Sequence, residues 1–337
     1  MDLARKAQYF TLDVISDLGY GRPLGDLAAD DDLYNHIQAT ADTLGAQAFA
    51  VATGLLRVLL LPSVHRRLIS ENDEQGLGKI VGYHAPYLAW PATTDPCPRS
   101  TIRKIIRQRL DSKVEGKEDM VYAWMKNGLN EDDLVTEATL QIIAGSDANA
   151  TAIRSTMLLL MSNPAAYRSL QKEIDAAESE WRAMETHVAI SNSNALNLPY
   201  LQAVIKEGMR AFPPAADPAP KVVPQGGDSV VIEGRTISLP GGTNICNSAW
   251  GLLHRKDIFG EDAAMFRPER WLEVEGEKLV RMQKTLELVF GYGRWQCLGM
   301  TIAKMQLNKI FYEVRTLREQ TVHVLHSLRQ LTMSRSF

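Results

Sequence analysis

The residues best suited to chemistry lie together in the ten-residue stretch Phe290–Gly299, which reads FGYGRWQCLG. It combines an aromatic side chain, glycines on both sides of a tyrosine, the cation Arg294 and the cysteine Cys297. A helix is predicted to follow from Leu298 to Phe311, and a helix N-terminus favours the thiolate form of a cysteine through its dipole and free N–H groups. The glycines let the backbone approach a flat ligand, and Arg294 can pair with a carboxylate. The stretch therefore predicts either a thiolate ligand for heme iron or a structural cysteine buried in a turn.

The same stretch resembles the heme-binding loop of the cytochromes P450, whose common form is F-x-x-G-x-R-x-C-x-G. The sequence departs from that form at one place, because the arginine stands at the fifth position (Arg294) and Trp295 occupies the sixth. The resemblance implies that Cys297 is the metal ligand of heme b (iron protoporphyrin IX) and that Arg294 takes over the contact to a heme propionate. The residues that it assigns to cofactor binding are Cys297, Arg294, Lys221, Phe290, Gly291 and Gly293.

Two further motifs follow the family's order. Glu207 and Arg210 share one face of the helix predicted to begin at Pro199, and the segment Phe266–Trp271 reads FRPERW. From the residues alone, the alternative for Glu207 and Arg210 is a surface salt bridge that adds little stability, although their helix neighbours are apolar. The resemblance implies instead that they join Arg270 in a network that supports the heme loop.

A long helix is predicted from Asn130 to Met161, with acidic residues at its start. Its sequence AGSDA resembles the oxygen-activating motif A-G-x-[DE]-T of the family, so Gly145 is expected to permit a local kink and Asp147 to feed protons. Ala148 stands where the family has threonine, which predicts poorly coupled oxygen activation or a reaction that does not need this proton relay. The residues assigned to catalysis are Gly145, Asp147 and Asn149, with Thr151 as a substitute hydroxyl.

The remaining pattern is mostly helical. Apolar positions recur near the helical period from Met1 to Gly19, a segment with no capping residue ahead of it. Paired prolines after the Pro199 helix predict an extended segment that contains Lys221, for which a plain surface lysine is the alternative. A β-hairpin is predicted over Val230–Leu239 with its turn at Glu233-Gly234. Further helices are expected over Leu33–Leu44, Thr101–Lys113, Ala165–Met184 and Pro199–Ala211.

The fold class predicted from this pattern and the resemblance is mainly α with a minor β-rich part, an incomplete cytochrome P450 fold. Residues 1–337 are expected to form a single heme-thiolate domain in which the family's N-terminal anchor and early helices are absent. Residues 82–100 contain four prolines and are predicted to be an atypical insertion. Residues 313–337 are predicted to be an atypical tail. The resemblance covers about residues 1–81 and 115–312.

Composition limits the class of protein. The chain has 337 residues, of which 45% are hydrophobic and 23% charged, and its formal net charge is −3, which argues against nucleic acid as a partner. Three scattered cysteines give no disulfide framework. No signal peptide or membrane span is visible, so the chain is expected to be cytoplasmic or in peripheral contact with a membrane. Full-length fungal members of the family are expected on the cytosolic face of the endoplasmic reticulum.

The function expected from the resemblance is that of a heme-dependent monooxygenase of the fungal pisatin-demethylase-like branch. It would oxidise a small apolar organic substrate in secondary metabolism, with electrons from NADPH delivered by a separate reductase. Two alternatives stay open. The chain is a truncated, non-catalytic remnant or the product of a wrongly assembled gene, or it is a heme isomerase or dehydratase on the same scaffold, which Ala148 favours.

Overall fold

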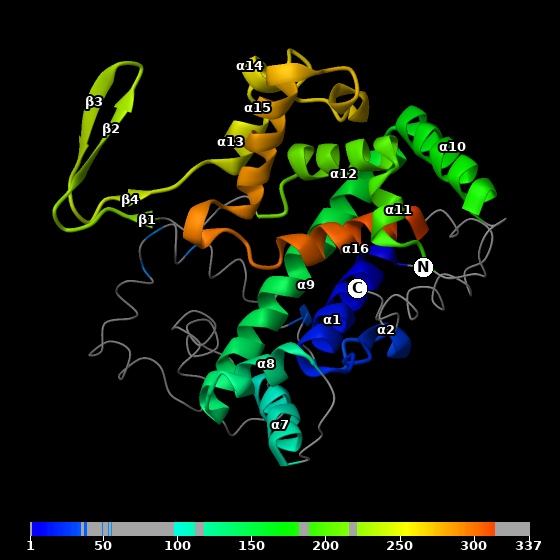
Figure 1. The fold of residues 1–337 in the computed structure, drawn as a ribbon, viewed down its shortest axis with the longest axis vertical. Helices are drawn as coiled ribbons and strands as arrows, with labels where there is room; N and C mark the ends of the chain where they lie inside the picture. Colours follow the sequence, from blue (N-terminus) through cyan, green and yellow to red (C-terminus); the bar gives the residue numbers. More distant parts are fainter. Residues whose placement is uncertain are drawn as a thin grey trace. The chain divides into compact units, whose positions relative to one another are not determined.

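The structure is a computed structural model. It describes residues 2–34, 98–111, 118–181, 189–215 and 221–313, together with the isolated positions 37, 38, 49, 53 and 55. The chain forms two compact units, one from Met1 to Ala150 and the other from Thr151 to Leu331, and the boundary falls inside the long helix α9 (Figure 1). Most of the expected helix at 33–44, most of the insertion at 82–100 and the tail beyond 313 lie outside the described residues.

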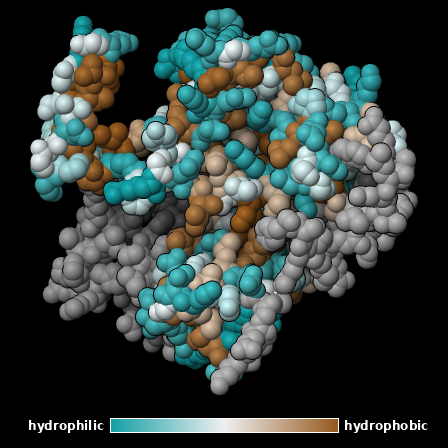
Figure 2. All heavy atoms as spheres, in the orientation of Figure 1, coloured by the Kyte–Doolittle hydropathy of each residue, from teal (hydrophilic) through white to brown (hydrophobic). Residues whose placement is uncertain are grey.

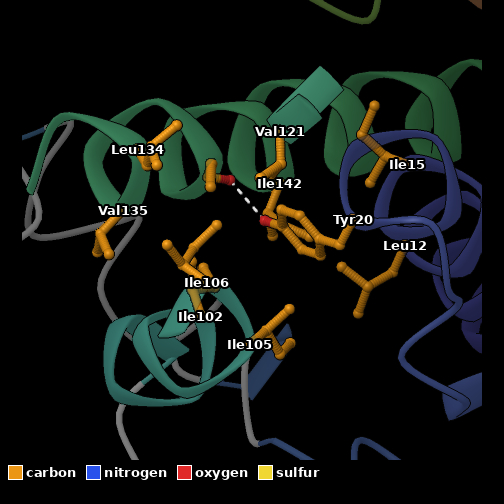
Figure 3. Packing of buried hydrophobic residues seen from close by; sticks show 11 residues of the cluster. Leu12, Ile15, Tyr20, Ile102, Ile105, Ile106, Val121, Leu134, Val135 and Ile142 are labelled. Atoms are coloured by element: carbon orange, nitrogen blue, oxygen red, sulfur yellow. Dashed lines mark hydrogen bonds between the residues drawn. The ribbon is translucent and has the colours of Figure 1, made fainter. Parts of the chain in front are cut away.

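The first unit is built from helices around one apolar core. Its elements are α1 (Leu3–Tyr20), α2 (Asp26–Ala29), α7 (Pro98–Asp111), α8 (Met120–Lys126) and the first part of α9 (Glu131–Ser162). The cluster in Figure 3 is made of aliphatic side chains from α1, α7, α8 and α9, together with Tyr20. The hydroxyl of Tyr20 donates a hydrogen bond of 2.7 Å to the carbonyl of Ala138, so this buried polar group is satisfied.

Two helix starts differ from the sequence prediction. The carboxylate of Asp2 accepts hydrogen bonds from the N–H groups of Ala4 and Arg5, so α1 does have an N-cap, which the prediction missed by counting Asp2 as part of the helix. The helix α7 begins at Pro98 rather than Thr101. Proline is well tolerated in the first helical turn, because its missing N–H would have no helical partner there.

The second unit is organised around the amphipathic helix α12 (Pro199–Ala211), which packs against α10 (Pro164–Trp181), α16 (Met300–Glu313) and the short helix η1 (Pro268–Trp271). The apolar face of α12 is buried. Gly208 allows the α9 segment of this unit to approach closely, because a Cβ at Gly208 would lie 2.0 Å from Oγ1 of Thr156. The shorter helices of the unit are α11 (Asn192–Leu196), α13 (Ala249–Leu253), α14 (Lys256–Phe259), α15 (Gly276–Glu287), η2 (Leu288–Phe290) and η3 (Gly293–Trp295).

The β structure consists of two antiparallel pairs in the second unit. Strand β1 (Lys221–Val222) pairs with β4 (Asn244–Ile245), and β2 (Asp228–Ile232) pairs with β3 (Arg235–Leu239). The predicted hairpin is confirmed, and both turn residues, Glu233 and Gly234, have positive φ (50° and 76°), as a tight two-residue hairpin turn requires. Figure 2 shows apolar side chains on the surface of this hairpin, and Val231 is 67% exposed.

The described residues therefore confirm the predicted class, mainly α with a minor β part. The helices predicted from 130, 165 and 199 correspond to α9, α10 and α12. Among the residues that the structure describes, no helix is both long enough and apolar enough to cross a membrane.

Candidate functional site

Backbone hydrogen bonds close the loop that carries Cys297. The N–H of Cys297 donates to the carbonyl of Phe290 at 2.6 Å, and the N–H of Gln296 donates to the carbonyl of Gly293 at 3.0 Å. Gly291 and Gly293 have φ values of 75° and 62°, which side chains with a Cβ rarely adopt. A Cβ on Gly291 would also lie 2.9 Å from the carbonyl oxygen of Trp295. The positive φ values of Gly291 and Gly293, and the close approach at Gly291, therefore determine the shape of the loop without any ligand.

The helix after the loop begins later than predicted. Helix α16 starts at Met300, and the carbonyl of Gly299 accepts the hydrogen bond from the N–H of Ala303 at 2.8 Å. Gly299 therefore occupies the N-cap position, where glycine is well accepted, and Leu298 belongs to the turn before the helix. Cys297 therefore lies three residues before the first helical residue rather than directly before it, which corrects the predicted start at Leu298.

Apolar side chains of the loop that carries Cys297 face outward, next to the exposed polar residues Arg294 and Gln296. Leu298 is 100% exposed and Tyr292 is 82% exposed, and Cys297 itself is exposed, so the alternative of a buried structural cysteine is wrong. Apolar side-chain surface left in water is unfavourable, at roughly 25 cal/mol for each Å². A flat apolar group placed over the loop would cover these side chains, and a single sulfur is a donor that suits heme iron. The residues present fit a heme group.

Two cations gather beside this loop around one indole ring. Nζ of Lys221, from β1, lies 4.8 Å from the ring centroid of Trp295, and Cζ of Arg294 lies 5.0 Å from the same centroid. Neither cation forms an ion pair with any carboxylate in the described part of the chain. The structure thus brings together Lys221 and Arg294, which are 73 positions apart in the sequence, with Trp295 between them in space.

The helix residues Glu207 and Arg210 and the downstream Arg270 form a buried network. The guanidinium of Arg210 makes a bidentate contact with Glu207, through Nε at 2.9 Å and Nη2 at 2.8 Å. Nε of Arg270 donates to Oε1 of Glu207 at 3.0 Å. All three side chains are almost completely buried, so the surface-salt-bridge alternative for Glu207 and Arg210 is wrong. The bidentate contact is directional, and burial removes water from all three charged groups. The network therefore holds α12 and η1 together.

The network has members that the sequence motifs did not indicate. The indole N–H of Trp271 donates to Oε2 of Glu207 at 2.9 Å, and the N–H of Arg267 donates to Oε1 at 2.9 Å. Asp262 accepts from Arg270 at 2.9 Å and also pairs with Arg267. Burial would raise the pKa of Asp262, but hydrogen bonds from Arg267 and Arg270 outweigh it and hold the pKa below its usual value. Only the position of Trp271 next to Arg270 was a signal for its role.

Gly145, Asp147 and Asn149 belong to the first unit and are described with it. A Cβ at Gly145 would lie 2.5 Å from Cγ1 of the buried Ile15, so this glycine lets α1 and α9 pack closely, a role the motif did not indicate. Nε2 of Gln8 donates to Oδ1 of Asp147 at 3.3 Å. Asn149 is partly buried in the same helix, which is continuous through Gly145. Gln8 is a partner of Asp147 that sequence reasoning missed.

Comparison with known proteins identifies the family. A family model described as cytochrome P450 matches residues 1–333. The chain belongs to the cytochrome P450 family. The cofactor of this family is heme b, the group that the loop around Cys297 fits.

Several fungal cytochromes P450 are similar to this chain. Cytochrome P450 monooxygenase ABA1 from Pyricularia oryzae is 38% identical over 316 residues, covering 93% of this chain and 57% of that protein. Cytochrome P450 monooxygenase aba1 from Botryotinia fuckeliana is 32% identical with the same coverage, 93% and 57%. Pisatin demethylase from Fusarium vanettenii is 27% identical and again covers 93% of this chain and 57% of its own length. The chain thus spans a little over half the length of these relatives.

A solved cytochrome P450 has the same fold. The crystal structure of the heme domain of cytochrome P450DA matches with a TM-score of 0.64 at 16% identity, covering 94% of this chain and 61% of that one. The predicted fold and the predicted likeness to the pisatin-demethylase-like branch are therefore confirmed. The roles of individual residues in this cytochrome P450 stay predictions, supported by the geometry described above.

Proposed function

We propose that this cytochrome P450 is a heme-thiolate monooxygenase in which Cys297 is the proximal ligand of the heme iron. The observation that carries the proposal is the exposed Cys297 at the end of a loop closed by its own backbone, with exposed apolar side chains around it. A sulfur that is accessible and fixed by the bond from its own N–H to Phe290 is what a thiolate ligand needs.

The chain's own residues hold and orient the cofactor. When bound, heme supplies the activation of molecular oxygen. Cys297 Sγ would hold the metal, and Arg294 and Lys221, the two cations beside Trp295, would hold the propionate carboxylates through charge-assisted hydrogen bonds. The network of Glu207, Arg210 and Arg270 keeps α12 and η1 fixed within the same unit as the loop.

Proton supply is the weak point of the proposed reaction. Asp147 is held by Gln8 and is the proposed source of protons, with Gly145 and Asn149 beside it in α9. Position 148, where the family motif has a hydroxyl, carries only the methyl group of Ala148. Because proton transfer needs a positioned donor or an ordered water, we expect a large share of the electrons to be lost without product formation.

The proposed reaction inserts one oxygen atom from O2 into a C–H bond of a small apolar organic substrate and releases the other as water. The two electrons and two protons that this balance requires come from NADPH and solvent, with a separate NADPH–cytochrome reductase as electron donor. Secondary metabolism is the proposed setting, which the fungal relatives support, since one of them is named pisatin demethylase.

A second candidate function is a heme-dependent isomerase or dehydratase, which Ala148 favours because such reactions need no proton relay to oxygen. The experiment that separates the two supplies heme-loaded chain, reductase, NADPH and oxygen gas enriched in the heavy isotope. A monooxygenase consumes oxygen in the presence of substrate, and its product carries one labelled oxygen atom. A product that forms without oxygen consumption and without label would assign the isomerase or dehydratase reaction instead.

The proposed location of the whole protein is the cytosolic face of the endoplasmic reticulum. Exposed β-branched side chains of the hairpin β2–β3, including Val231 and Ile232, support a peripheral contact with a lipid surface. Co-sedimentation with lipid vesicles tests this contact: the double substitution Val231→Asp and Ile232→Asp should release the chain, and unchanged sedimentation would contradict the contact.

A further inference from the structure

Trp295 replaces a charged residue of the family motif with an aromatic one. It stands at the sixth position of the loop, where the common motif has arginine, and 60% of its surface is exposed. Its backbone is fixed, because its N–H donates to the carbonyl of Tyr292 in the turn of the short helix η3 and its carbonyl oxygen lies against Gly291. The ring is therefore presented to solvent from a rigid part of the loop.

Two flexible cations use this ring as a common support. Nζ of Lys221 lies 4.8 Å and Cζ of Arg294 lies 5.0 Å from the centroid of Trp295, distances at which a cation is attracted by the ring's quadrupole. Because each charge lies no more than 5.0 Å from the same ring centroid, the two charges are at most twice that distance apart, and they repel each other. No carboxylate in the described part of the chain compensates them. The arrangement selects an anionic ligand that offers negative charge to both cations.

We infer that Trp295 is a positioning residue that pre-organises Lys221 and Arg294 for the two carboxylates of heme, an inference that rests on the proposed function. Lysine and arginine side chains lose much rotamer freedom when a ligand immobilises them. The indole holds both cations near the binding geometry before the cofactor arrives, so less freedom is lost on binding. One aromatic residue and two cations thereby replace the single arginine of the common motif.

The test measures heme affinity of the full chain by titration of the apoprotein, followed by absorbance and by quenching of intrinsic fluorescence. Trp295→Leu is expected to weaken heme binding by about tenfold, from the loss of two cation–π contacts and of pre-organisation. Trp295→Phe keeps an aromatic face and should restore most of the affinity. Trp250→Leu is the matched control, because Trp250 is also an exposed tryptophan, stacked on His254 at 4.3 Å. It should leave heme affinity unchanged.

A second probe tests whether the effect of Trp295 on affinity depends on the heme carboxylates. Heme dimethyl ester has no free carboxylates, so the wild-type chain should bind it more weakly than heme, and Trp295→Leu should weaken it no further. The inference is overturned if Trp295→Leu binds heme as tightly as the wild type. It is equally overturned if this variant loses as much affinity for the ester as for heme, because the indole would then act as an apolar contact only.

A third comparison keeps the test valid if Trp295→Leu folds poorly. Lys221→Gln alters an exposed strand residue, and it should weaken heme binding in the wild type and in Trp295→Phe, which keeps the aromatic support, but have a smaller effect in Trp295→Leu. No effect of Lys221→Gln in the wild type, or equal effects in all three backgrounds, would overturn the inference. Failure of the proposed function would be seen in a different measurement, because the wild-type chain itself would then show no thiolate signature in the carbon monoxide complex of reduced heme.

Discussion

Glu207 Oε1 accepts a hydrogen bond from Nε of Arg270 at 3.0 Å, although the two residues are 63 positions apart and lie in different elements. Both side chains are almost completely buried, and Arg210 binds the same carboxylate. A buried carboxylate with two arginines is stable only if every partner is present. This pair therefore links α12 to η1 in a way that tolerates little change.

Glu207→Gln is expected to lower the free energy of unfolding by about 3 kcal/mol, because it leaves two buried guanidinium groups without their counter-charge. The measurement is the urea midpoint of unfolding. Asp257→Asn is the control, since Asp257 pairs with Arg255 and Arg281 at the surface and its loss should leave the midpoint nearly unchanged. A midpoint for Glu207→Gln equal to that of the control would contradict the buried network.

Gly145→Ala is expected to destabilise the chain by about 1–3 kcal/mol, because the added methyl group would overlap the buried Ile15 and force α1 away from α9. Gly19→Ala is a matched control within α1, since a Cβ there meets nothing within 4 Å. That change should stabilise the helix by up to about 1 kcal/mol. Thermal unfolding of both variants decides the matter, and equal shifts would refute the close approach at Gly145.

Asp26 should make stability depend on pH. Burial, and then the charge of Asp13, raise the pKa of Asp26 to about 7, against the opposing hydrogen bond from Leu33 N–H. Since the folded state holds this proton more tightly than the unfolded chain, whose value is about 4, the contribution of Asp26 to stability is full below pH 4. It is lost as the pH rises from about 4 to 7, by an amount on the order of 4 kcal/mol.

Chemical unfolding of the wild type and Asp26→Asn at pH 5 and pH 8 tests this. The asparagine side chain cannot ionise, so the variant should gain stability over the wild type between pH 5 and pH 8. The difference between the two proteins isolates Asp26 from the other titrating groups. A difference that is constant with pH, or that moves in favour of the wild type at pH 8, would show that Asp26 is ionised in the folded chain.

Ala148→Thr should raise the yield of product per electron pair, because it restores a hydroxyl at the motif position next to Asp147. Ala148→Val is the matched control, since valine has the shape of threonine without the hydroxyl. The measurement is product formed against NADPH consumed. If threonine gives no gain over alanine, or valine gives the same gain, the missing hydroxyl is not the cause of poor coupling.

Much of the fold could be predicted from local sequence. Amphipathic period and a proline at the first helical position indicated the bounds of α12, and Glu233-Gly234 indicated the hairpin turn, because both signals are local. The pairing of Glu207 with Arg210 followed from helical spacing, but their burial, the contact of Glu207 with Trp271 and the contact of Arg270 with Asp262 did not. Those depend on how α12 and η1 pack, and spacing within one helix carries no information on packing.

The sequence predicted individual site residues but not the contacts between residues from distant segments. The Cys297 loop was found from its glycines and its motif, because these residues are contiguous. The common contact of Lys221 and Arg294 with Trp295 was missed, since it joins a strand to a loop across 74 positions. The packing role of Gly145 was missed for the same reason, because it depends on Ile15 in α1.

The carbon monoxide difference spectrum of the reduced, heme-loaded chain shows directly whether Cys297 binds the iron. We expect the red-shifted band of a thiolate-ligated heme in the wild type and in Cys246→Ser, whose cysteine is also exposed, and no such band in Cys297→Ser. A wild-type chain that binds heme without this band, or a Cys297→Ser variant that keeps it, would contradict the assignment of Cys297 as the iron ligand.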